Sequence, residues 1–274
     1  MRIGRRKFIL RLFLGLTGMA GLLFLNGFWF ERYIIDWTSF DIDEEQNDKI
    51  KLIQLSDLHL NEIKSYHKSI ANKINKEKPD AILFTGDTIS RRNKLPILKE
   101  FLNLLDNNIL KIVILGNKEY SSRVSITDFT ELFQEYNGHI LVNENYRLEK
   151  NNRAVNLLGI DDFMGGNPDY KKACGNIDKT LETIVLNHCP EYRERIDNLN
   201  KTEKVNIKLI LSGHTHGGQI TFFGKELYKP GGSGRYLRGW YKNGQSSMYV
   251  SKGVGTTILP IRFGARAEAS IFYI

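Results

Sequence analysis

Short apolar runs alternate with amphipathic stretches along most of the chain. The apolar runs predict buried strands at 50–55, 81–84, 110–115, 183–186, 207–211, 248–252 and 270–274. The amphipathic stretches predict helices at 65–77, 95–106, 126–136 and 191–199. A further segment, 146–160, is typical of a hairpin that turns near Asn151-Asn152. This alternation indicates a layered α/β protein with mostly parallel strands, and the last strands allow a second sheet.

The segment 12–30 (LFLGLTGMAGLLFLNGFWF) contains no charged residue. As a helix it would be about 28 Å long, close to the ~30 Å thickness of the hydrocarbon core of a bilayer. A cleaved signal peptide is the alternative, but such a peptide has a shorter apolar core and ends in small residues. Here the run ends in Phe28-Trp29-Phe30, and Arg32 follows. These residues suit a membrane–water interface, so we expect an uncleaved transmembrane anchor.

The formal net charge is +8, and most of it lies in the first 32 residues. Basic residues before the apolar run predict that the N-terminus stays in the cytoplasm and that the rest of the chain crosses the membrane. The Arg5-Arg6 pair also resembles a twin-arginine export signal. We therefore expect the main domain outside the cytoplasmic membrane, with the cytoplasmic face as the alternative. The remaining charge excess is too small to indicate a nucleic-acid partner, and we expect none.

The patterns divide the chain into four parts. These are a basic flank at 1–11, the transmembrane segment at 12–30, a polar linker or edge strand at 31–48, and one domain at 49–274. We expect this domain to be a monomer. The two cysteines, Cys174 and Cys189, do not have the spacing of a zinc site.

Residue types that bind metals follow five of the predicted strands. They are Asp57 and His59, then Asp87, Asn117 and His188, and finally the pair His214 and His216. In open α/β sheets, ligands bind at the carboxyl ends of the strands. Four of the six histidines fall at these ends, which argues against histidines scattered through the core or over the surface.

On these residues the chain resembles the calcineurin-like metallophosphoesterase family. The ordered blocks Asp57-x-His59, Gly86-Asp87, Gly116-Asn117, His188 and Gly213-His214-x-His216 match its signature, and the resemblance covers about 49–274. It implies a four-layer α/β/β/α sandwich of two mixed sheets flanked by helices. The match is strongest to the membrane-associated bacterial branch. Some members of that branch resemble UDP-2,3-diacylglucosamine diphosphatases of lipid A biosynthesis, and others are general phosphoesterases.

The resemblance also implies a pair of divalent metal ions. One would be bound by Asp57, His59, Asp87 and His216, and the other by Asp87, Asn117, His188 and His214. Oxygen and imidazole ligands without a thiolate suit Mn²⁺, Fe²⁺, Zn²⁺ or Mg²⁺. Two such ions about 3.5–4 Å apart can hold a bridging hydroxide that attacks a phosphoryl group in line. This implies a metal-dependent hydrolase of phosphoric ester or anhydride bonds, with Cys189 a buried residue rather than a nucleophile.

The residue after Asn117 departs from the family pattern. The family has a histidine there, which stabilises the transition state or protonates the leaving group, whereas this chain has Lys118. We expect Asn117 and Lys118 to act in catalysis, with the lysine ammonium as a donor to the phosphoryl group. Proton donation is harder for lysine, so an anhydride, whose leaving group needs little protonation, is favoured over an alkyl monoester. The alternative is a metal-binding protein that has lost catalysis.

Glycine, basic and aromatic residues are concentrated at 228–245, after the last histidine pair. This segment is predicted either to fold over the active site or to rest its aromatic side chains on the core or the membrane. Arg235 and Arg238 are the predicted substrate-binding residues, together with Arg262 in the segment 259–263, which also matches the membrane-associated branch of the family. Asp161 is either a carboxylate that orients a metal ligand or a turn cap.

Taken together, the residues predict a membrane-anchored phosphoesterase. Its substrate is expected to be a phosphorylated small molecule or a lipid-linked molecule, with a UDP-2,3-diacylglucosamine-like precursor as the leading candidate. A general envelope phosphodiesterase or phosphatase is the alternative.

Overall fold

The computed structural model describes residues 4–44, 48–243 and 246–274. Its first sheet has six strands in the order β1-β14-β2-β3-β4-β5. They are β1 (Asp36–Asp41), β14 (Glu268–Tyr273), β2 (Lys51–Leu55), β3 (Ala81–Thr85), β4 (Leu110–Ile114) and β5 (Gly138–Ile140). The strands from β2 to β5 are parallel, and β14 pairs antiparallel with β2. The three neighbours β2, β3 and β4 therefore end at the same edge.

The second sheet also has six strands, in the order β12-β13-β9-β8-β7-β6. They are β12 (Gly239–Lys242), β13 (Ser247–Val250), β9 (Ile207–Ser212), β8 (Thr183–Leu186), β7 (Arg153–Gly159) and β6 (Glu144–Lys150). Its four central strands are parallel, and both edge pairs are antiparallel. The expected hairpin is thus β6–β7, and mixed sheets with mostly parallel strands are confirmed.

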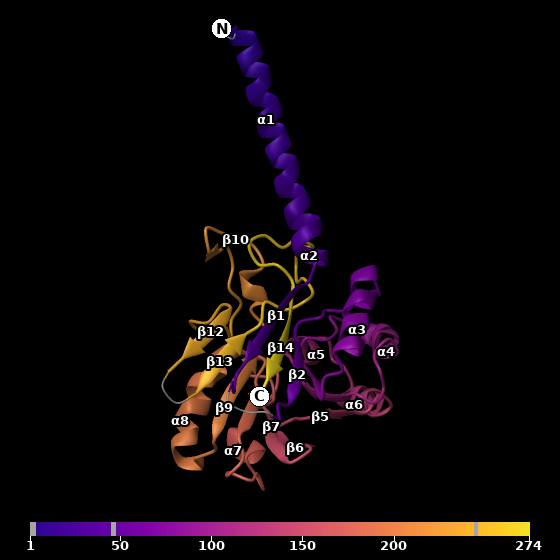
Figure 1. Cartoon of the computed structure of the whole chain (residues 1–274), viewed down its shortest axis with the longest axis vertical. Coiled ribbons are helices and arrows are strands. Elements are labelled where there is room, and N and C mark those ends of the chain that lie inside the picture. Colours follow the sequence, from indigo (N-terminus) through magenta and orange to yellow (C-terminus); the bar gives the residue numbers. More distant parts are fainter. Residues whose placement is uncertain (1–3, 45–47, 244–245) are drawn as a thin grey trace.

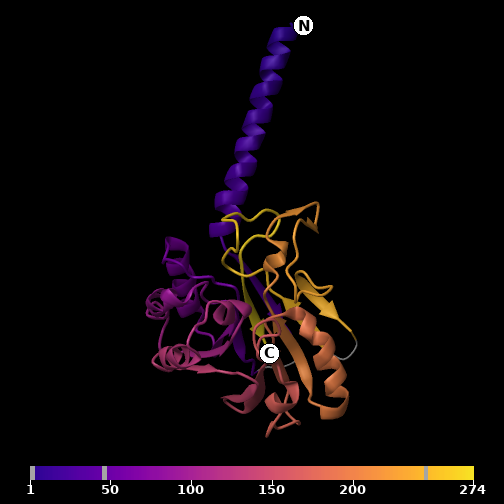
Figure 2. The same cartoon turned by 180° about the vertical axis from the view of Figure 1, so that it is seen from behind.

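Three layers of apolar contact hold four layers of structure together. Strand β3 shows how the period-two pattern is used: Ala81 and Leu83 face the second sheet, while Ile82 and Phe84 face the helices of the first. These helices are α3 (Ser65–Glu77), α4 (Leu95–Leu102) and α6 (Ile126–Gln134). The second sheet is covered by α7 (Tyr170–Ala173) and α8 (Arg193–Glu203). Figures 1 and 2 show the two groups of helices on opposite sides of the sheets, which is the expected α/β/β/α arrangement.

A long N-terminal helix projects from one end of this sandwich (Figure 1). Helix α1 (Arg5–Leu25) continues through a π-helical turn at Asn26–Phe30 into α2 (Glu31–Tyr33). In the described part of the chain it is the one helix whose length and composition would allow it to cross a membrane. Its base is fixed to the domain, because the Arg262 backbone N–H donates to Gly27 O at 3.0 Å and the Ala265 N–H donates to the Glu31 carboxylate at 3.0 Å.

Several elements differ from the sequence-based expectations. The segment 31–48, expected to be a linker or an edge strand, contains the edge strand β1, which pairs parallel with β14. The expected helix 95–106 ends at Leu102. The short elements β5, α5 (Asn117–Ser121), β10 (Thr221–Phe222) and β11 (Lys225–Glu226) have too few residues to show a period. The ends of three expected segments, namely 1–3 of the basic flank, 45–47 of the linker and 244–245 of the glycine-rich loop, lie outside the described residues.

Candidate metal centre

The carboxyl ends of β2, β3 and β4 in the first sheet meet those of β8 and β9 in the second. Each strand carries one or two of the predicted ligands just beyond its last residue. As a result the structure brings together all seven residues: Asp57, His59, Asp87, Asn117, His188, His214 and His216. All are buried except Asn117, which is partly buried.

One group of ligand atoms is formed by Asp57, His59 and His216. The Nε2 atoms of the two histidines are 3.0 Å apart, and their rings are stacked. Asp57 Oδ1 lies 3.5 Å from His216 Nε2 and 4.0 Å from His59 Nε2. Three ligand atoms therefore converge within 4.8 Å, a spacing that suits one cation.

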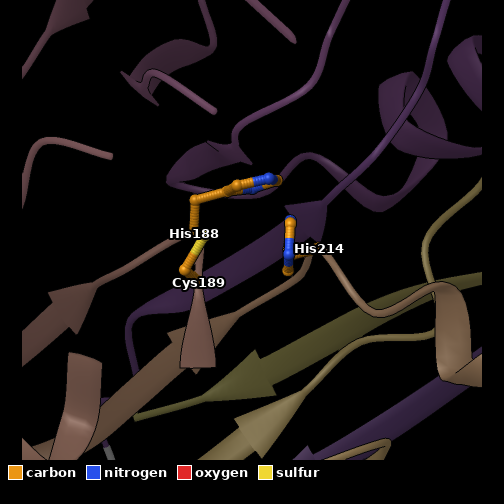
Figure 3. Close-up of side chains that lie close together, drawn as sticks. All are labelled: His188, Cys189 and His214. Carbon is orange, nitrogen blue, oxygen red and sulfur yellow. The ribbon is translucent and has the colours of Figure 1, made fainter. Parts of the chain in front are cut away.

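The other group is formed by Asn117, His188 and His214. Asn117 Oδ1 lies 2.9 Å from His214 Nδ1 and 3.3 Å from His188 Nε2. The remaining nitrogen of each ring donates to a carbonyl: His188 Nδ1 to Thr85 O at 2.7 Å, and His214 Nε2 to Gly231 O at 2.6 Å. These hydrogen bonds leave His188 Nε2 and His214 Nδ1 free to face the centre, as in metal-binding histidines. Figure 3 shows the two rings close together.

Asp87 connects the two groups. Its Oδ2 lies 3.5 Å from His59 Nε2 in the first group, and its Oδ1 lies 3.4 Å from His188 Nε2 in the second. Because the two carboxylate oxygens face different histidines, Asp87 has the geometry of a bridging ligand. The donor set thus fits two divalent cations that share Asp87, and this arrangement is what the resemblance implied.

The backbone of the site is unusual. Five of the seven residues have positive φ: Asp57 (52°), His59 (46°), Asp87 (54°), His214 (71°) and His216 (51°). Each such conformation costs of order 1–3 kcal/mol for a residue with a side chain and is typical of functional sites. The neighbouring glycines provide room, since a Cβ at Gly116 would overlap Asp87 Oδ1, and one at Gly213 would overlap Ser56 Oγ.

Burial and charge shift the pKa values of the site strongly. Burial alone would raise the pKa of Asp57, but His216, His188 and His59 lower it to about 2. Burial raises the pKa of Asp87 well above its usual value. Burial would lower the pKa of His188, yet Asp87 and Asp57 raise it to about 9. An imidazole that holds its proton so firmly while fully buried indicates a strongly negative potential, which favours cations.

Glu119 is a buried carboxylate that the sequence reasoning did not assign. It accepts hydrogen bonds from the backbone N–H groups of Gly116 (2.9 Å), Asp87 (3.0 Å) and Thr88 (2.7 Å). The side chain therefore ties the end of β4 to the end of β3 and fixes the position of Asp87. Its place directly after Lys118 was the available sequence signal.

Cys189 and Asp161 lie near the centre and have other partners. Cys189 is buried beside His188 (Figure 3), and its thiol donates to Asp162 Oδ1 at 3.2 Å. Burial raises the thiol pKa, so the expectation of a buried residue is confirmed and a thiolate is disfavoured. Asp161 accepts from the Tyr120 hydroxyl and from the Asn167 N–H, so it caps a turn.

Two cavities open beside the centre. The first, which we term the apolar cavity, has a volume of about 450 Å³ and contains Asp87, Asn117, His214 and His216 in its wall. Its apolar lining comes from Met164, Leu227, Tyr228, Ile258 and Leu259. The second, the basic cavity, has a volume of about 480 Å³ and is lined by His59 and by the charged residues Arg32, Glu62, Lys64, Arg91 and Lys118. Lys118 and the loop 257–259 border both cavities.

Among the described residues, none of the three arginines expected to bind substrate lines either cavity, although Arg262 Nη2 lies 3.5 Å from His216 Nδ1 behind the site. Arg262 is fully buried, and its guanidinium donates to the carbonyls of Gly253, Gly255 and Ala265, so it holds the backbone together. Arg238 donates to Gly264 O and Gly217 O. Arg235 pairs with Glu194 at 3.3 Å on the surface.

The aromatic residues of the predicted substrate loop divide between the core and the cavity. Tyr236 is buried against the helices of the second sheet, and Trp240 packs in β12 against Phe40 and Tyr249. Tyr228 instead lines the apolar cavity, and the carbonyl of Gly231 accepts from His214. Within the described part of this loop, 228–243, the residues that line the apolar cavity are therefore at its beginning.

Comparisons with known proteins indicate the same family as the residues of the site. Residues 50–218 match the family described as calcineurin-like phosphoesterase. The chain is 30% identical to the uncharacterized metallophosphoesterase YkuE of Bacillus subtilis, over 99% of this chain and 97% of that protein. It is also 30% identical to the UDP-2,3-diacylglucosamine pyrophosphatase LpxG of Chlamydia muridarum, over 63% of this chain and 65% of that protein.

A likeness to solved structures supports the fold. A dimetal phosphatase from Danio rerio superposes with a TM-score of 0.52 at 10% identity, covering 76% of this chain and 88% of that one. With the domain match over most of the two sheets, the near full-length relative and the two-sheet architecture in agreement, this chain belongs to the calcineurin-like phosphoesterase family of metal-dependent hydrolases.

Proposed function

We propose that this protein hydrolyses a phosphoric ester or anhydride bond in an amphiphilic, lipid-linked substrate with the help of two divalent metal ions. The observation that carries the proposal is the position of Asp87, which joins two groups of ligand atoms at the wall of an apolar cavity. Asp57, His59 and His216 would hold one ion with Asp87, and Asn117, His188 and His214 the other. A pair of such ions neutralises phosphoryl charge and makes water nucleophilic at neutral pH.

Lys118 lies beside the metal centre and can position the phosphoryl group of the substrate. The backbone N–H of Lys118 donates to Asp87 Oδ1 at 2.8 Å, so the lysine backbone is fixed beside the centre. Its side chain borders both cavities, where an ammonium group can donate to an oxygen of the phosphoryl group. Lys118→Ala should therefore lower kcat more than it raises KM, whereas Lys118→His should keep part of the activity. Unchanged turnover in both variants would show that Lys118 has no chemical role.

The two cavities favour a substrate with unlike ends. The apolar cavity can take an acyl or prenyl group, and the basic cavity, with four cationic residues and one acidic residue in its wall, can take an anionic group. UDP-2,3-diacylglucosamine has this character, and LpxG, whose name states that it acts on that molecule, is a relative. We propose a molecule of this class as the substrate, with α1 as the membrane anchor. A nucleotide-linked substrate requires the catalytic domain on the cytoplasmic face, whereas the outer face would require a substrate of the envelope that carries no nucleotide.

The proposal is tested with the full chain in detergent, loaded with Mn²⁺ or Zn²⁺ and supplied with three substrates. These are UDP-2,3-diacylglucosamine, bis-p-nitrophenyl phosphate and a simple phosphate monoester. We expect the amphiphilic diphosphate to give the largest kcat/KM and Asp87→Asn to abolish turnover, while His139→Ala, a change at an exposed histidine in β5, leaves it unchanged. Hydrolysis of the soluble esters alone would favour a general phosphodiesterase. Two bound metals without hydrolysis of any substrate would overturn the proposal.

A further inference from the structure

Exposed apolar side chains gather at one end of the catalytic domain. In the described part of the chain beyond the long helix, large exposed hydrophobic residues are Ile34, Ile126, Met164, Phe222, Phe223, Leu227, Tyr228, Ile258 and Leu259. Six of them lie on two neighbouring segments, the β10–β11 hairpin with the residues that follow it and the loop 257–259. Phe223 at the hairpin tip is fully exposed, and Ile258 is 84% exposed. A contiguous apolar patch of this kind marks an interaction surface.

The two segments contact each other and form one continuous surface. The Gln219 side chain donates to Thr257 O at 2.9 Å and to Leu259 O at 3.0 Å, and accepts from the Thr257 N–H at 2.8 Å. Next to the hairpin tip, the Phe222 and Phe263 rings are 5.3 Å apart. These contacts hold the two segments next to each other, with their apolar side chains exposed.

This surface lies at the end of the domain from which α1 projects. Both views place β10 and the loop before β14 beside the base of the long helix (Figures 1 and 2). A hydrogen bond from the Arg262 N–H to Gly27 O at 3.0 Å joins that loop to the helix. Exposed Trp29 and Phe30 continue the apolar character from the helix to the domain. If α1 enters a bilayer, the patch therefore faces the surface of the same bilayer.

We infer that the β10–β11 hairpin tip and the loop 257–259 form a second membrane contact, which inserts Phe222, Phe223, Ile258 and Leu259 into the interface of the bilayer that α1 enters. The occupant is lipid rather than a protein partner, because the patch is continuous with a helix that is exposed along its length and carries no charged residue from Leu12 to its end. Tyr228 suits the headgroup level, and Lys225 on β11 is exposed toward lipid phosphates.

The contact has a consequence for the site, and this step rests on the proposed function. Leu227, Tyr228, Ile258 and Leu259 belong both to the patch and to the wall of the apolar cavity. The mouth of that cavity then opens at the lipid surface. An acyl or prenyl phosphate derivative can pass from the bilayer to the metal centre without exposing its apolar chain to water.

The first experiment measures how deeply the hairpin tip and the loop 257–259 insert into the bilayer, and it requires no catalytic activity. Cys174 and Cys189 are both buried, so a single introduced cysteine can be labelled with an environment-sensitive fluorophore. Phe223→Cys and Ile258→Cys are compared with Ile126→Cys, a position on α6 that is also exposed, in full-length protein in nanodiscs carrying nitroxide lipids. We expect blue-shifted emission and strong quenching at 223 and 258, and neither at 126. The inference would be overturned if the labels at 223 and 258 are as exposed to water as the label at 126. It would also be overturned if they are shielded from water but not quenched by lipid nitroxide.

The second experiment measures the consequence for substrate access. The double variant Phe222→Ser and Phe223→Ser alters residues that do not line either cavity, and Ile126→Ser is the matched control. We expect kcat/KM for an amphiphilic phosphodiester in vesicles to fall several-fold in the double variant, with turnover of soluble bis-p-nitrophenyl phosphate unchanged. If the double variant keeps the same fraction of the wild-type kcat/KM on both substrates, the access step is contradicted. If wild type hydrolyses neither substrate, the proposed function fails, while the depth measurement still decides the membrane contact.

Discussion

At the level of single residues, Asp87 differs from the other candidate ligands because it contacts both halves of the site. Its two oxygens lie 3.5 Å from His59 Nε2 and 3.4 Å from His188 Nε2. The Asp57 carboxylate lies beside the ring nitrogens of His59 and His216 in the first half, and its hydrogen bond to the second half comes from the backbone N–H of His214 at 3.0 Å. Two isosteric substitutions therefore separate a shared ligand from an unshared one.

Asp87→Asn should remove both metal ions, because it takes a negative charge from each half. We expect activity to fall by more than about 100-fold, beyond the 10–100-fold typical of residues that only orient ligands. Asp57→Asn should retain one ion per chain. Metal analysis of the purified variants checks this. Two ions per chain in Asp87→Asn would show that the carboxylate does not bridge.

His67 is a buried histidine outside the metal centre, on α3. Burial lowers its pKa to about 4. Its Nδ1 accepts from the Lys64 N–H at 3.0 Å, while Nε2 has no hydrogen-bond partner among the described residues. Between pH 6.5 and 4 the unfolded chain therefore binds a proton at this residue that the folded chain does not, and stability falls as pH falls.

The expected size of this effect is up to about 3 kcal/mol, from a shift of roughly two and a half pKa units. His67→Gln keeps a side-chain acceptor but does not titrate. Urea unfolding at pH 7 and at pH 4.5 should show a smaller loss of stability in the variant than in wild type. Parallel losses in the two proteins would contradict the role of His67, since the other titrating groups are common to both.

At the level of elements, the ends of β3 and β4 and the start of α5 depend on Glu119. Glu119→Ala would leave three buried N–H groups, those of Gly116, Asp87 and Thr88, without their acceptor. Each orphaned group costs about 1–3 kcal/mol, so we expect a loss of at least about 3 kcal/mol in urea unfolding. Glu135→Ala is the control, because it breaks only the exposed pair with Lys99, worth about 0–1 kcal/mol. Equal losses in both variants would refute the role of Glu119.

The same elements show what sequence could predict. Central strands such as β3 and β9 are continuous apolar runs, and a candidate ligand follows each strand directly, so the strand and the place of the candidate ligand were predictable. For β1 the sequence left a linker and an edge strand open, because its residues are mostly polar and its pairing with β14 spans more than 200 positions. The structural role of Arg262 was not predictable for a related reason. The partners of Arg262 are backbone carbonyls, which leave no mark in the sequence.

At the level of the whole molecule, the metal centre lies where the two sheets meet. Asp57, Asp87 and Asn117 follow strands of the first sheet, whereas His188 and His214 follow strands of the second. Contacts between candidate ligands from the two sheets include His188 with Asp87 and His214 with Asn117. Ions bound there would join the halves of the sandwich as well as perform chemistry, so metal binding and folding stability should be linked.

Removal of metal should therefore destabilise the whole domain. An ion at a thousand times its Kd adds about 4 kcal/mol to stability when it binds only the folded chain. We expect chelation to lower the thermal midpoint of the full-length protein and Mn²⁺ or Zn²⁺ to restore it. Asp87→Asn, which cannot bridge the ions, should unfold near the chelated wild-type midpoint and respond little to chelator. If the thermal midpoint of the wild type changes with neither chelator nor added metal, the two sheets are held together by their apolar layer alone.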